Sequence, residues 1–306
     1  MATTHLTEPR RTQVRSADGT RINVEVRGPD DGTTVVLAHC WATSLDSWAP
    51  VVRQLPPDLR VVLYDQRGHG RSEHPPASGY HTTALADDLC AVLDETTNEP
   101  AIVCGHSIGG MSIMAAAPRP AFRTRVAAAL LANTGCTNLT GQSNALPVPK
   151  ALSRGAAAAF LRAPAPLGPA NPVTAAALRH MTMGPAASPE AVRACAQLVH
   201  RCSALPRARW GHVLSTLELS DQVRELTVPT MVLSGNADRF TPPWHARRLA
   251  ELLPHLLGVV HVPDIGHMGP LEAPAELARV INQLATTHTP SRNGTASAAP
   301  ETERAA

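Results

Sequence analysis

The sequence predicts an α/β protein with a mostly parallel sheet and helices on both of its faces. Short apolar runs alternate along the chain with longer amphipathic segments, an alternation typical of such sheets. Apolar residues make up 43% of the 306 residues and charged residues only 17%, so the chain can fill a large core. At about 150 residues per domain, this length suggests roughly two domains.

Eight strands are expected. The Asp18-Gly19 pair, between residues 13–17 and 21–27, is a strong hairpin signal. The six later strands are short apolar runs of the kind that parallel sheets bury. They cover residues 34–40, 61–65, 101–105, 126–135, 230–235 and 258–262.

Helices are expected between most of these strands, and Ser44 is a candidate N-cap for the first of them. Their ranges are residues 45–55, 83–95, 243–253 and 273–286, with one further helix that starts near Ser107 and stops before Pro118.

Residues 137–205 break this alternation, since they are rich in Pro and Ala and contain no convincing strand. A loop of this length is improbable inside a compact domain. Short helices are expected instead at residues 151–162, 175–181 and 188–202, the last with Ser188 as N-cap. We therefore expect a helical cap at 137–205, inserted into one core made of residues 13–136 and 206–288.

The two ends, residues 1–12 and 289–306, are polar and are expected to be disordered tails. The N-terminus lacks the apolar segment of a secretory signal, and no apolar run is long enough to span a membrane. A cytoplasmic protein is therefore expected. A net charge of +2 without a basic block disfavours nucleic-acid binding. No heptad run is visible, and the oligomeric state stays open.

The six cysteines are scattered and include no C-x-x-C pair, which indicates reduced thiols rather than disulfides. No His, Cys and carboxylate cluster has metal-ligand spacing, so neither a metal nor a cofactor is expected. The segment Arg67-Gly68-His69-Gly70-Arg71-Ser72 follows the wrong strand for a phosphate loop and lacks its Lys. We expect a structural turn there, with Arg67 and His69 tying loops together.

The strongest chemical signal is Gly105-His106-Ser107-Ile108-Gly109, which directly follows an expected strand and opens a helix. In this G-x-S-x-G arrangement a sharp turn lifts the serine hydroxyl above the sheet edge. A glycine-rich turn whose Ser only caps a helix is the simpler alternative. A serine nucleophile also needs a base and an acid that orients the base.

Both partners have candidates at the same sheet edge. Asp238 follows the strand at 230–235, and His267 follows the strand at 258–262. Ser107, Asp238 and His267 therefore stand in the chain order described for α/β-hydrolases. An isolated Asp or His would carry little weight, but three in order, each after an expected strand, favour a catalytic triad.

On these residues the chain resembles the α/β-hydrolase fold superfamily, in its serine-nucleophile branch with a helical cap. The resemblance runs from about residue 13 to 287 and includes HCWATSLDSW (39–48), YDQRGHGRS (64–72) and NADRFTP (236–242). It implies that Ser107 is the nucleophile, His267 the general base and acid, and Asp238 the orienting acid. It also implies that the backbone N–H groups of Ile108 and Trp41 form the oxyanion hole.

The chain departs from the family pattern at two positions. Cys40 stands where the family usually has Gly, and a positive φ there would be costly for a side chain. Some members carry the acid after the sixth strand, where this chain has Asn133, so Asp238 is the only well-placed candidate.

The substrate pocket is expected to be apolar. Its candidate lining residues flank the triad and the oxyanion loop: His39, Cys40, His106, Phe240, Trp244 and Met268. His39 is expected to hold its loop rather than touch substrate.

A serine hydrolase that cleaves a small, largely uncharged carboxylic ester or lactone is the function that the resemblance implies. Perhydrolysis of the cofactor-free haloperoxidase type, C–C bond or thioester hydrolysis, and acyl transfer stay open, because the cap and the pocket decide between them. A non-hydrolytic binding or receptor-like protein, or a biosynthetic cyclase, is the alternative of another class.

Overall fold

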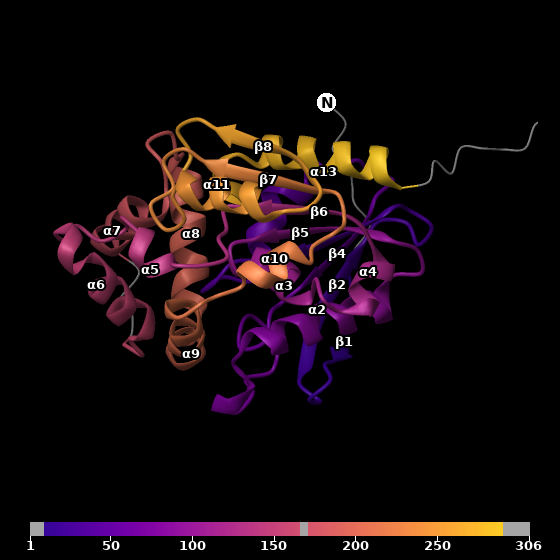
Figure 1. Ribbon diagram of the computed structural model, residues 1–306, viewed down its shortest axis with the longest axis horizontal. Helices are drawn as coiled ribbons and strands as arrows, with labels where there is room; N and C mark the ends of the chain where they lie inside the picture. The colour runs from indigo at the N-terminus through magenta and orange to yellow at the C-terminus, as the bar shows by residue number, and fades with distance from the viewer. Residues whose placement is uncertain (1–8, 166–170, 290–306) are drawn as a thin grey trace, which may run out of the picture.

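An eight-stranded sheet forms the centre of the molecule (Figure 1). The structure is a computed structural model and describes residues 9–165 and 171–289. The strands are β1 (Arg10–Arg15), β2 (Arg21–Arg27), β3 (Thr34–Ala38), β4 (Arg60–Tyr64), β5 (Ala101–His106), β6 (Val126–Ala132), β7 (Thr230–Gly235) and β8 (Leu256–Val262). Their order is β1-β2-β4-β3-β5-β6-β7-β8, and only the β1–β2 and β2–β4 pairs are antiparallel. The expected mostly parallel sheet of eight strands is confirmed.

The hairpin closes at the expected place, since Gly19 takes a φ of +85° and the Ser16 N–H donates to the Thr20 carbonyl. The start of β1 was predicted wrongly. The strand begins at Arg10, so residues 10–12 belong to the sheet and not to a tail. The reason is that an edge strand pairs through its backbone and needs no apolar pattern. The predicted disorder of 1–8 and 290–306 lies outside the described residues.

Each expected helix lies close to its expected range, and six helices were missed. The core contains η1 (Leu45–Trp48), α1 (Ala49–Val52), η2 (Ala77–Gly79), α2 (Thr82–Thr96), α3 (Ile108–Ala116), α4 (Pro120–Arg125), α10 (Ser220–Arg224), α11 (Pro243–Leu252), α12 (Gly269–Glu272) and α13 (Pro274–His288). The insertion contains α5 (Leu139–Gln142), α6 (Lys150–Arg162), α7 (Pro172–Thr182), α8 (Pro189–Arg201) and α9 (Ala204–Ser215). The helices without an expected counterpart are η2, α4, α5, α9, α10 and α12.

Two apolar clusters lie on the two faces of the sheet, as the alternation along each strand requires. In β3, Val36 and Ala38 join a cluster that includes residues of α2, α3 and α11. The intervening Val35 and Leu37 join the other cluster, with residues of α1 and α13. The central strands β3–β7 are therefore buried on both sides, which explains why they read as continuous apolar runs.

Helices α5–α9 all lie between β6 and β7 in sequence and gather at one end of the sheet (left in Figure 1). The expected boundary at 205/206 falls inside α9, so it was placed too early. Pro206 argues against a helix in the sequence pattern because proline has no backbone N–H. In the first turn of a helix this N–H would have no partner within the helix, so proline is tolerated there. The Trp210 indole N–H anchors α9 to the core by donating to the Arg67 carbonyl at 2.9 Å.

Arg67 is fully buried and ties three separate segments together. Its guanidinium binds Asp88 through two hydrogen bonds of 2.6 and 2.7 Å and binds Asp18 at 2.7 Å. It also donates to the Gly79 carbonyl at 2.9 Å. Asp88 is itself buried, so this pair is shielded from solvent. The expectation that the 67–72 segment is a structural turn agrees with these contacts.

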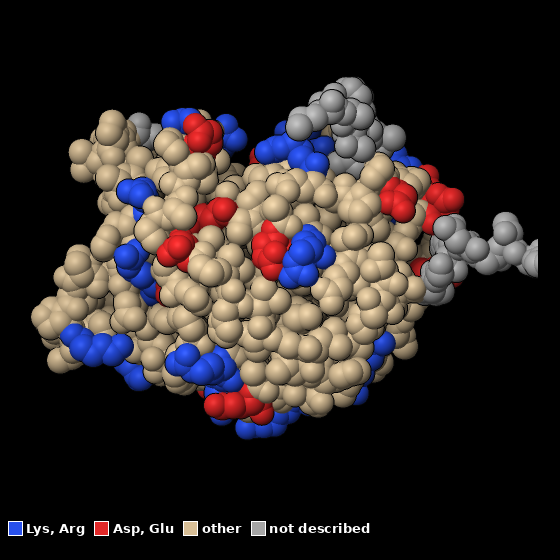
Figure 2. Space-filling view, turned by 90° about the horizontal axis from the view of Figure 1, so that it is seen from above, with Lys and Arg blue, Asp and Glu red and all other residues tan. Residues whose placement is uncertain are grey.

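Charged side chains on the face in Figure 2 lie scattered among neutral ones, and several cationic and anionic groups touch. This dispersion agrees with the small net charge of +2. Among the described residues, no helix is long and apolar enough to cross a membrane.

We expect Asp88→Asn to destabilise the fold by about 3 kcal/mol, because the fully buried Arg67 loses its buried counter-charge and keeps only the 45% exposed Asp18 as a carboxylate partner among the described residues. Urea unfolding followed by circular dichroism would measure this loss. Asp87→Asn is the matched control: the neighbouring Asp87 pairs with Arg119 near the surface, where such pairs contribute less than about 1 kcal/mol. Equal losses of stability in the two variants would contradict the stabilising role of the buried Arg67–Asp88 pair.

Candidate active site

Ser107 sits on a strained turn between β5 and α3, with φ 54° and ψ −114°. Such a conformation is rare for a residue with a side chain and is typical of functional sites. Glycines make the turn possible. A Cβ on Gly105 would lie 2.3 Å from the Gly109 carbonyl carbon, and one on Gly109 would lie 2.2 Å from the Ala38 oxygen.

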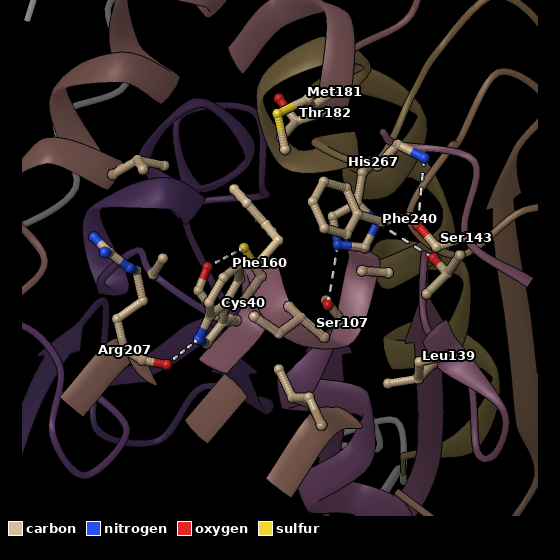
Figure 3. A pocket seen from close by; sticks show the side chains of 18 of the residues that line it. Cys40, Ser107, Leu139, Ser143, Phe160, Met181, Thr182, Arg207, Phe240 and His267 are labelled. Atoms are coloured by element: carbon tan, nitrogen blue, oxygen red, sulfur yellow. Dashed lines mark hydrogen bonds between the residues drawn. The ribbon is translucent and has the colours of Figure 1, made fainter. Parts of the chain in front are cut away.

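His267 and Asp238 meet Ser107 at the carboxyl edge of the sheet (Figure 3). The Ser107 Oγ lies 3.0 Å from His267 Nε2, and His267 Nδ1 lies 2.9 Å from Asp238 Oδ2. All three residues are largely buried, with Ser107 and His267 each 7% exposed. The structure thus brings the three expected triad residues into one hydrogen-bonded chain.

Asp238 is held as a carboxylate by its neighbours. Its Oδ1 accepts from the backbone N–H groups of Phe240 and Thr241 at 2.9 Å each. Its Oδ2 accepts from the Thr241 hydroxyl at 2.7 Å. The same oxygen lies 2.9 Å from His267 Nδ1. Burial by itself would raise the pKa of Asp238, but His267 and the Thr241 hydrogen bonds outweigh it and hold this pKa below its usual value.

Asn133 is a site residue whose contact the sequence did not indicate. Its side-chain amide donates to Asp238 Oδ2 at 3.1 Å and to the Gly266 carbonyl at 3.0 Å. It takes a φ of 45°, a conformation that Asn tolerates better than most residues. The position after β6 therefore holds an amide that binds the carboxylate of Asp238 in the loop after β7.

In the loop after β3, Cys40 does not take the positive φ that would be costly for a side chain. Cys40 is not among the described residues with positive φ, whereas Ala42 has a φ of 59°. The side chain at position 40 therefore causes no backbone strain. The Ala42 N–H donates to His69 Nε2 at 3.2 Å, which fixes the loop against the 67–72 turn. Burial raises the pKa of the Cys40 thiol to about 12, so this thiol stays protonated at neutral pH.

His39 and His106 are buried supports of the site. The His39 Nδ1–H donates to the Cys40 carbonyl at 2.7 Å, and its Nε2 accepts from the Gln66 N–H at 2.9 Å. His106 Nε2 donates to the His267 carbonyl at 2.6 Å and so holds the loop of the base. Burial lowers the pKa of His39 to about 4 and that of His106 to about 3.

A cavity of about 260 Å³ lies between the triad loops and the inserted helices. Its lining is predominantly apolar, and each of the helices α5–α9 contributes at least one residue. The residues that line the cavity include Cys40, Trp41, Ser107, Leu139, Phe160, Ala163, Ala165, Leu178, Met181, Val199, Arg207, Leu214, Phe240, His267 and Met268.

The expected pocket residues divide into two groups. Cys40, Phe240 and Met268 line this cavity, and Trp41 does so as well. The expectation was wrong for His39, His106 and Trp244. The two histidines are fully covered by the loops they support, and Trp244 lies on α11 beside a different surface hollow.

The inserted helices also hold the loop of the base directly. The His267 N–H donates to the Thr182 carbonyl at the end of α7, at 2.7 Å. The half-buried Glu272 accepts from the N–H groups of Gly184, Gly266 and Met268 at 2.7, 3.0 and 3.0 Å. One carboxylate therefore joins the insertion to both sides of His267, a link between distant residues with no local sequence signal.

The family model described as the alpha/beta hydrolase fold matches residues 33–274, a range that includes Ser107, Asp238 and His267. The chain belongs to the α/β-hydrolase fold family. Together with the eight-stranded sheet, this match confirms the resemblance that the sequence motifs indicated.

Some relatives of this α/β hydrolase match only part of the chain, and others match most of it. "Probable oxidoreductase EphD" of Mycobacterium tuberculosis is 42% identical over 116 residues, which are 37% of this chain but only 20% of EphD. The 3-oxoadipate enol-lactonase 2 of Acinetobacter baylyi is 25% identical over 270 residues, 88% of this chain and 94% of that enzyme. The crystal structure of the esterase RhEst1 from Rhodococcus sp. ECU1013 superposes with a TM-score of 0.67 at 26% identity, covering 91% of this chain and 99% of RhEst1.

We expect the stability of this α/β hydrolase to fall between pH 6.5 and pH 5. His39 and His106 have folded-state pKa values of about 4 and about 3, below the ordinary value of 6.5. In this window the unfolded chain therefore binds more protons than the folded chain. Each histidine then removes about 1.4 kcal/mol per pH unit once the pH lies well below 6.5.

Urea unfolding at several pH values would measure this slope. His106→Gln should reduce the slope of the unfolding free energy against pH by about the contribution of one histidine. The glutamine amide can still donate to the His267 carbonyl but does not titrate. A stability that stays flat across this window, or an unchanged slope in His106→Gln, would show that these rings are not held neutral.

Proposed function

We propose that this protein is a serine hydrolase that cleaves a small carboxylic ester or lactone through an acyl-enzyme. One observation carries the proposal: the Ser107 hydroxyl faces the apolar cavity and lies 3.0 Å from His267 Nε2. A buried serine, imidazole and carboxylate in this order are the groups that nucleophilic acyl transfer requires.

Acylation begins with the tautomer that Asp238 selects. Because His267 Nδ1 donates to the Asp238 carboxylate, its Nε2 carries a lone pair toward the Ser107 hydroxyl. As Ser107 Oγ attacks the ester carbonyl carbon, its proton passes to Nε2 and the carbonyl oxygen becomes an oxyanion. The C–O bond to the leaving alcohol then breaks, and Nε2 returns the proton to that alcohol.

Deacylation reverses these roles with water as the nucleophile. His267 Nε2 takes a proton from water, the hydroxide attacks the acyl carbon, and the Ser107–acyl bond breaks as Nε2 reprotonates Ser107. The Asp238 carboxylate stabilises the imidazolium in both halves and stays ionised throughout.

The oxyanion would be bound by the backbone N–H groups of Ile108 and Trp41. Ile108 is the first residue of α3, so its N–H has no acceptor within the helix. Among the hydrogen bonds of the described loops, none uses the Trp41 N–H; its indole N–H instead donates to the Arg207 carbonyl at 2.9 Å. One such donor typically contributes on the order of 3 kcal/mol to the transition state.

The substrate class follows from the lining of the cavity. Around Ser107 it consists of apolar side chains such as Phe160, Met181 and Phe240, which favour an apolar acyl chain. The esterase and lactonase names of long-coverage relatives support ester or lactone chemistry. We further propose that α5–α9 form the cap, extended to the end of α9, which shields the acyl-enzyme from bulk water. Perhydrolysis and the other chemistries of the same triad stay predictions.

Hydrolysis of p-nitrophenyl butyrate by the wild type and Ser107→Ala tests the proposal. We expect Ser107→Ala to lower kcat by about a million-fold, because the nucleophile acts as a unit with its base. Ser215→Ala, on the outer end of α9, serves as the control and should match the wild type. A wild type no more active than Ser107→Ala on a panel of esters, lactones and thioesters would instead favour a binding protein.

Asn133→Ala should lower kcat/KM by about 10-fold with little change in KM, because a hydrogen bond to a charged group is lost. In Asn133→Asp a second carboxylate faces Asp238 and favours the protonated imidazolium, so the acid limb of the pH–rate profile should move to higher pH. Asn138→Ala is the matched control, since Asn138 has a similar φ of 52° but hydrogen-bonds Arg154 outside the triad. An unshifted profile in Asn133→Asp would remove Asn133 from the positioning of the acid.

A further inference from the structure

Two arginines of the described chain are almost fully buried, and their surroundings differ. Arg67 is 0% exposed and binds the carboxylates of Asp88 and Asp18. Arg207, on α9, is 4% exposed and has no carboxylate within ion-pair distance among the described residues. A buried cation without a counter-charge is costly, so proteins normally pair it.

The pKa values of the two guanidinium groups reflect this difference. Burial lowers the pKa of Arg207 from its usual value. Burial acts in the same direction on Arg67, but Asp88 and Asp18 outweigh it and raise that pKa. Among the described residues, Arg207 is therefore a buried cation without a carboxylate partner.

Among the described residues, most of the N–H donors of the Arg207 guanidinium have no hydrogen-bond acceptor. Within the described part of the chain, its guanidinium makes one hydrogen bond, from Nη2 to the Ala165 carbonyl. A guanidinium carries five N–H donors in a planar fork that matches a carboxylate. Residues 166–170, which follow Ala165, read PLGPA and contain no acidic residue.

Arg207 lines the same cavity as the triad. It contributes to the cavity wall together with Ala163, Ala165 and Val199, and in Figure 3 its guanidinium lies well to the side of Ser107 and His267. No Asp or Glu is among the residues that line this cavity. A ligand that reaches from Ser107 to Arg207 would therefore meet a neutral wall that ends in one permanent positive charge.

We propose that Arg207 binds a carboxylate at the end of the substrate remote from the scissile bond, so that the preferred substrate is an ester or lactone with a carboxylate tail. This inference rests on the proposed function and adds the anionic tail to the largely uncharged substrate expected from the sequence. The apolar wall between the two sites would hold the connecting methylene chain. The fork of Arg207 would supply two charge-assisted hydrogen bonds.

A purely structural Arg207 makes a different prediction. The Arg207 carbonyl accepts the Trp41 indole N–H, and its guanidinium holds the Ala165 carbonyl. If these contacts were its whole role, removing the guanidinium would weaken the hydrolysis of every ester alike. If it binds a carboxylate, the loss would be confined to anionic substrates.

The test compares two series of methyl esters followed by pH-stat titration. The monomethyl esters of the straight-chain dicarboxylic acids from succinate to suberate each have a neutral partner, the methyl ester of the monocarboxylic acid of equal length. We expect the wild type to prefer the anionic ester at one or more chain lengths. Arg207→Gln should lower that preference about 10- to 100-fold, the range for hydrogen bonds to a charged group, and leave the neutral esters nearly unchanged.

Two further variants separate charge from fold. Arg207→Lys keeps a charge without the fork and should keep part of the preference. Arg209→Gln is the matched control one half-turn away, because Arg209 donates to the Pro75 carbonyl and does not line the cavity. It should leave the preference intact. Neutral esters hydrolysed at equal rates by Arg207→Gln and the wild type would show that the variant is folded.

No preference for the anionic ester at any chain length, or an equal loss for both series in Arg207→Gln, would overturn the inference while leaving the proposed hydrolase in place. A calorimetric titration of Ser107→Ala with the same half-esters measures their binding without hydrolysis. Binding that disappears in Ser107→Ala/Arg207→Gln would support the carboxylate site even if no ester were hydrolysed, whereas absent binding would count against it.

Discussion

The turn at Ser107 is the constraint on which the rest of the site depends. A backbone with φ 54° and ψ −114° can exist here only because glycines on either side let β5, α3 and β3 approach within van der Waals contact. That close approach places the serine hydroxyl above the sheet edge. The same edge receives the loops after β7 and β8, so Asp238 and His267 meet Ser107 there.

Buried charged side chains need hydrogen-bond or ion-pair partners, and this need determines much of the surrounding structure. Asp238 receives two backbone N–H groups, a hydroxyl, an amide and an imidazole, and Glu272 receives three backbone N–H groups. Arg67 receives two carboxylates. Each of these groups joins segments far apart in sequence, because a buried ion must collect partners wherever the fold supplies them. Arg207 stands apart because its nearest hydrogen-bond acceptor is a neutral carbonyl.

The inserted helices do more than close the cavity. The Thr182 carbonyl at the end of α7 accepts from the His267 N–H, and the Gly184 N–H donates to Glu272, which also binds the loop of His267. The indole N–H groups of Trp210 and Trp41 fix α9 from two sides. The position of the base and the shape of the pocket are therefore coupled. This coupling gives a physical reason why one fold can serve many substrates: changes in the insertion reach the chemistry through short contacts.

The sequence by itself predicted the mostly parallel sheet and the succession of strands along the chain, and it pointed to Ser107, Asp238 and His267 at one sheet edge, where they lie in contact. Those features follow from local signals: apolar runs, glycines at a tight turn, and polar residues directly after strands. Tertiary structure alone decided that Asn133 binds Asp238, that α9 belongs to the cavity wall, and that His106 supports His267 instead of lining the pocket. Such contacts join residues up to 161 positions apart. Only the packed chain shows which buried donors, acceptors and charges meet, because no local pattern encodes the partner at the other end.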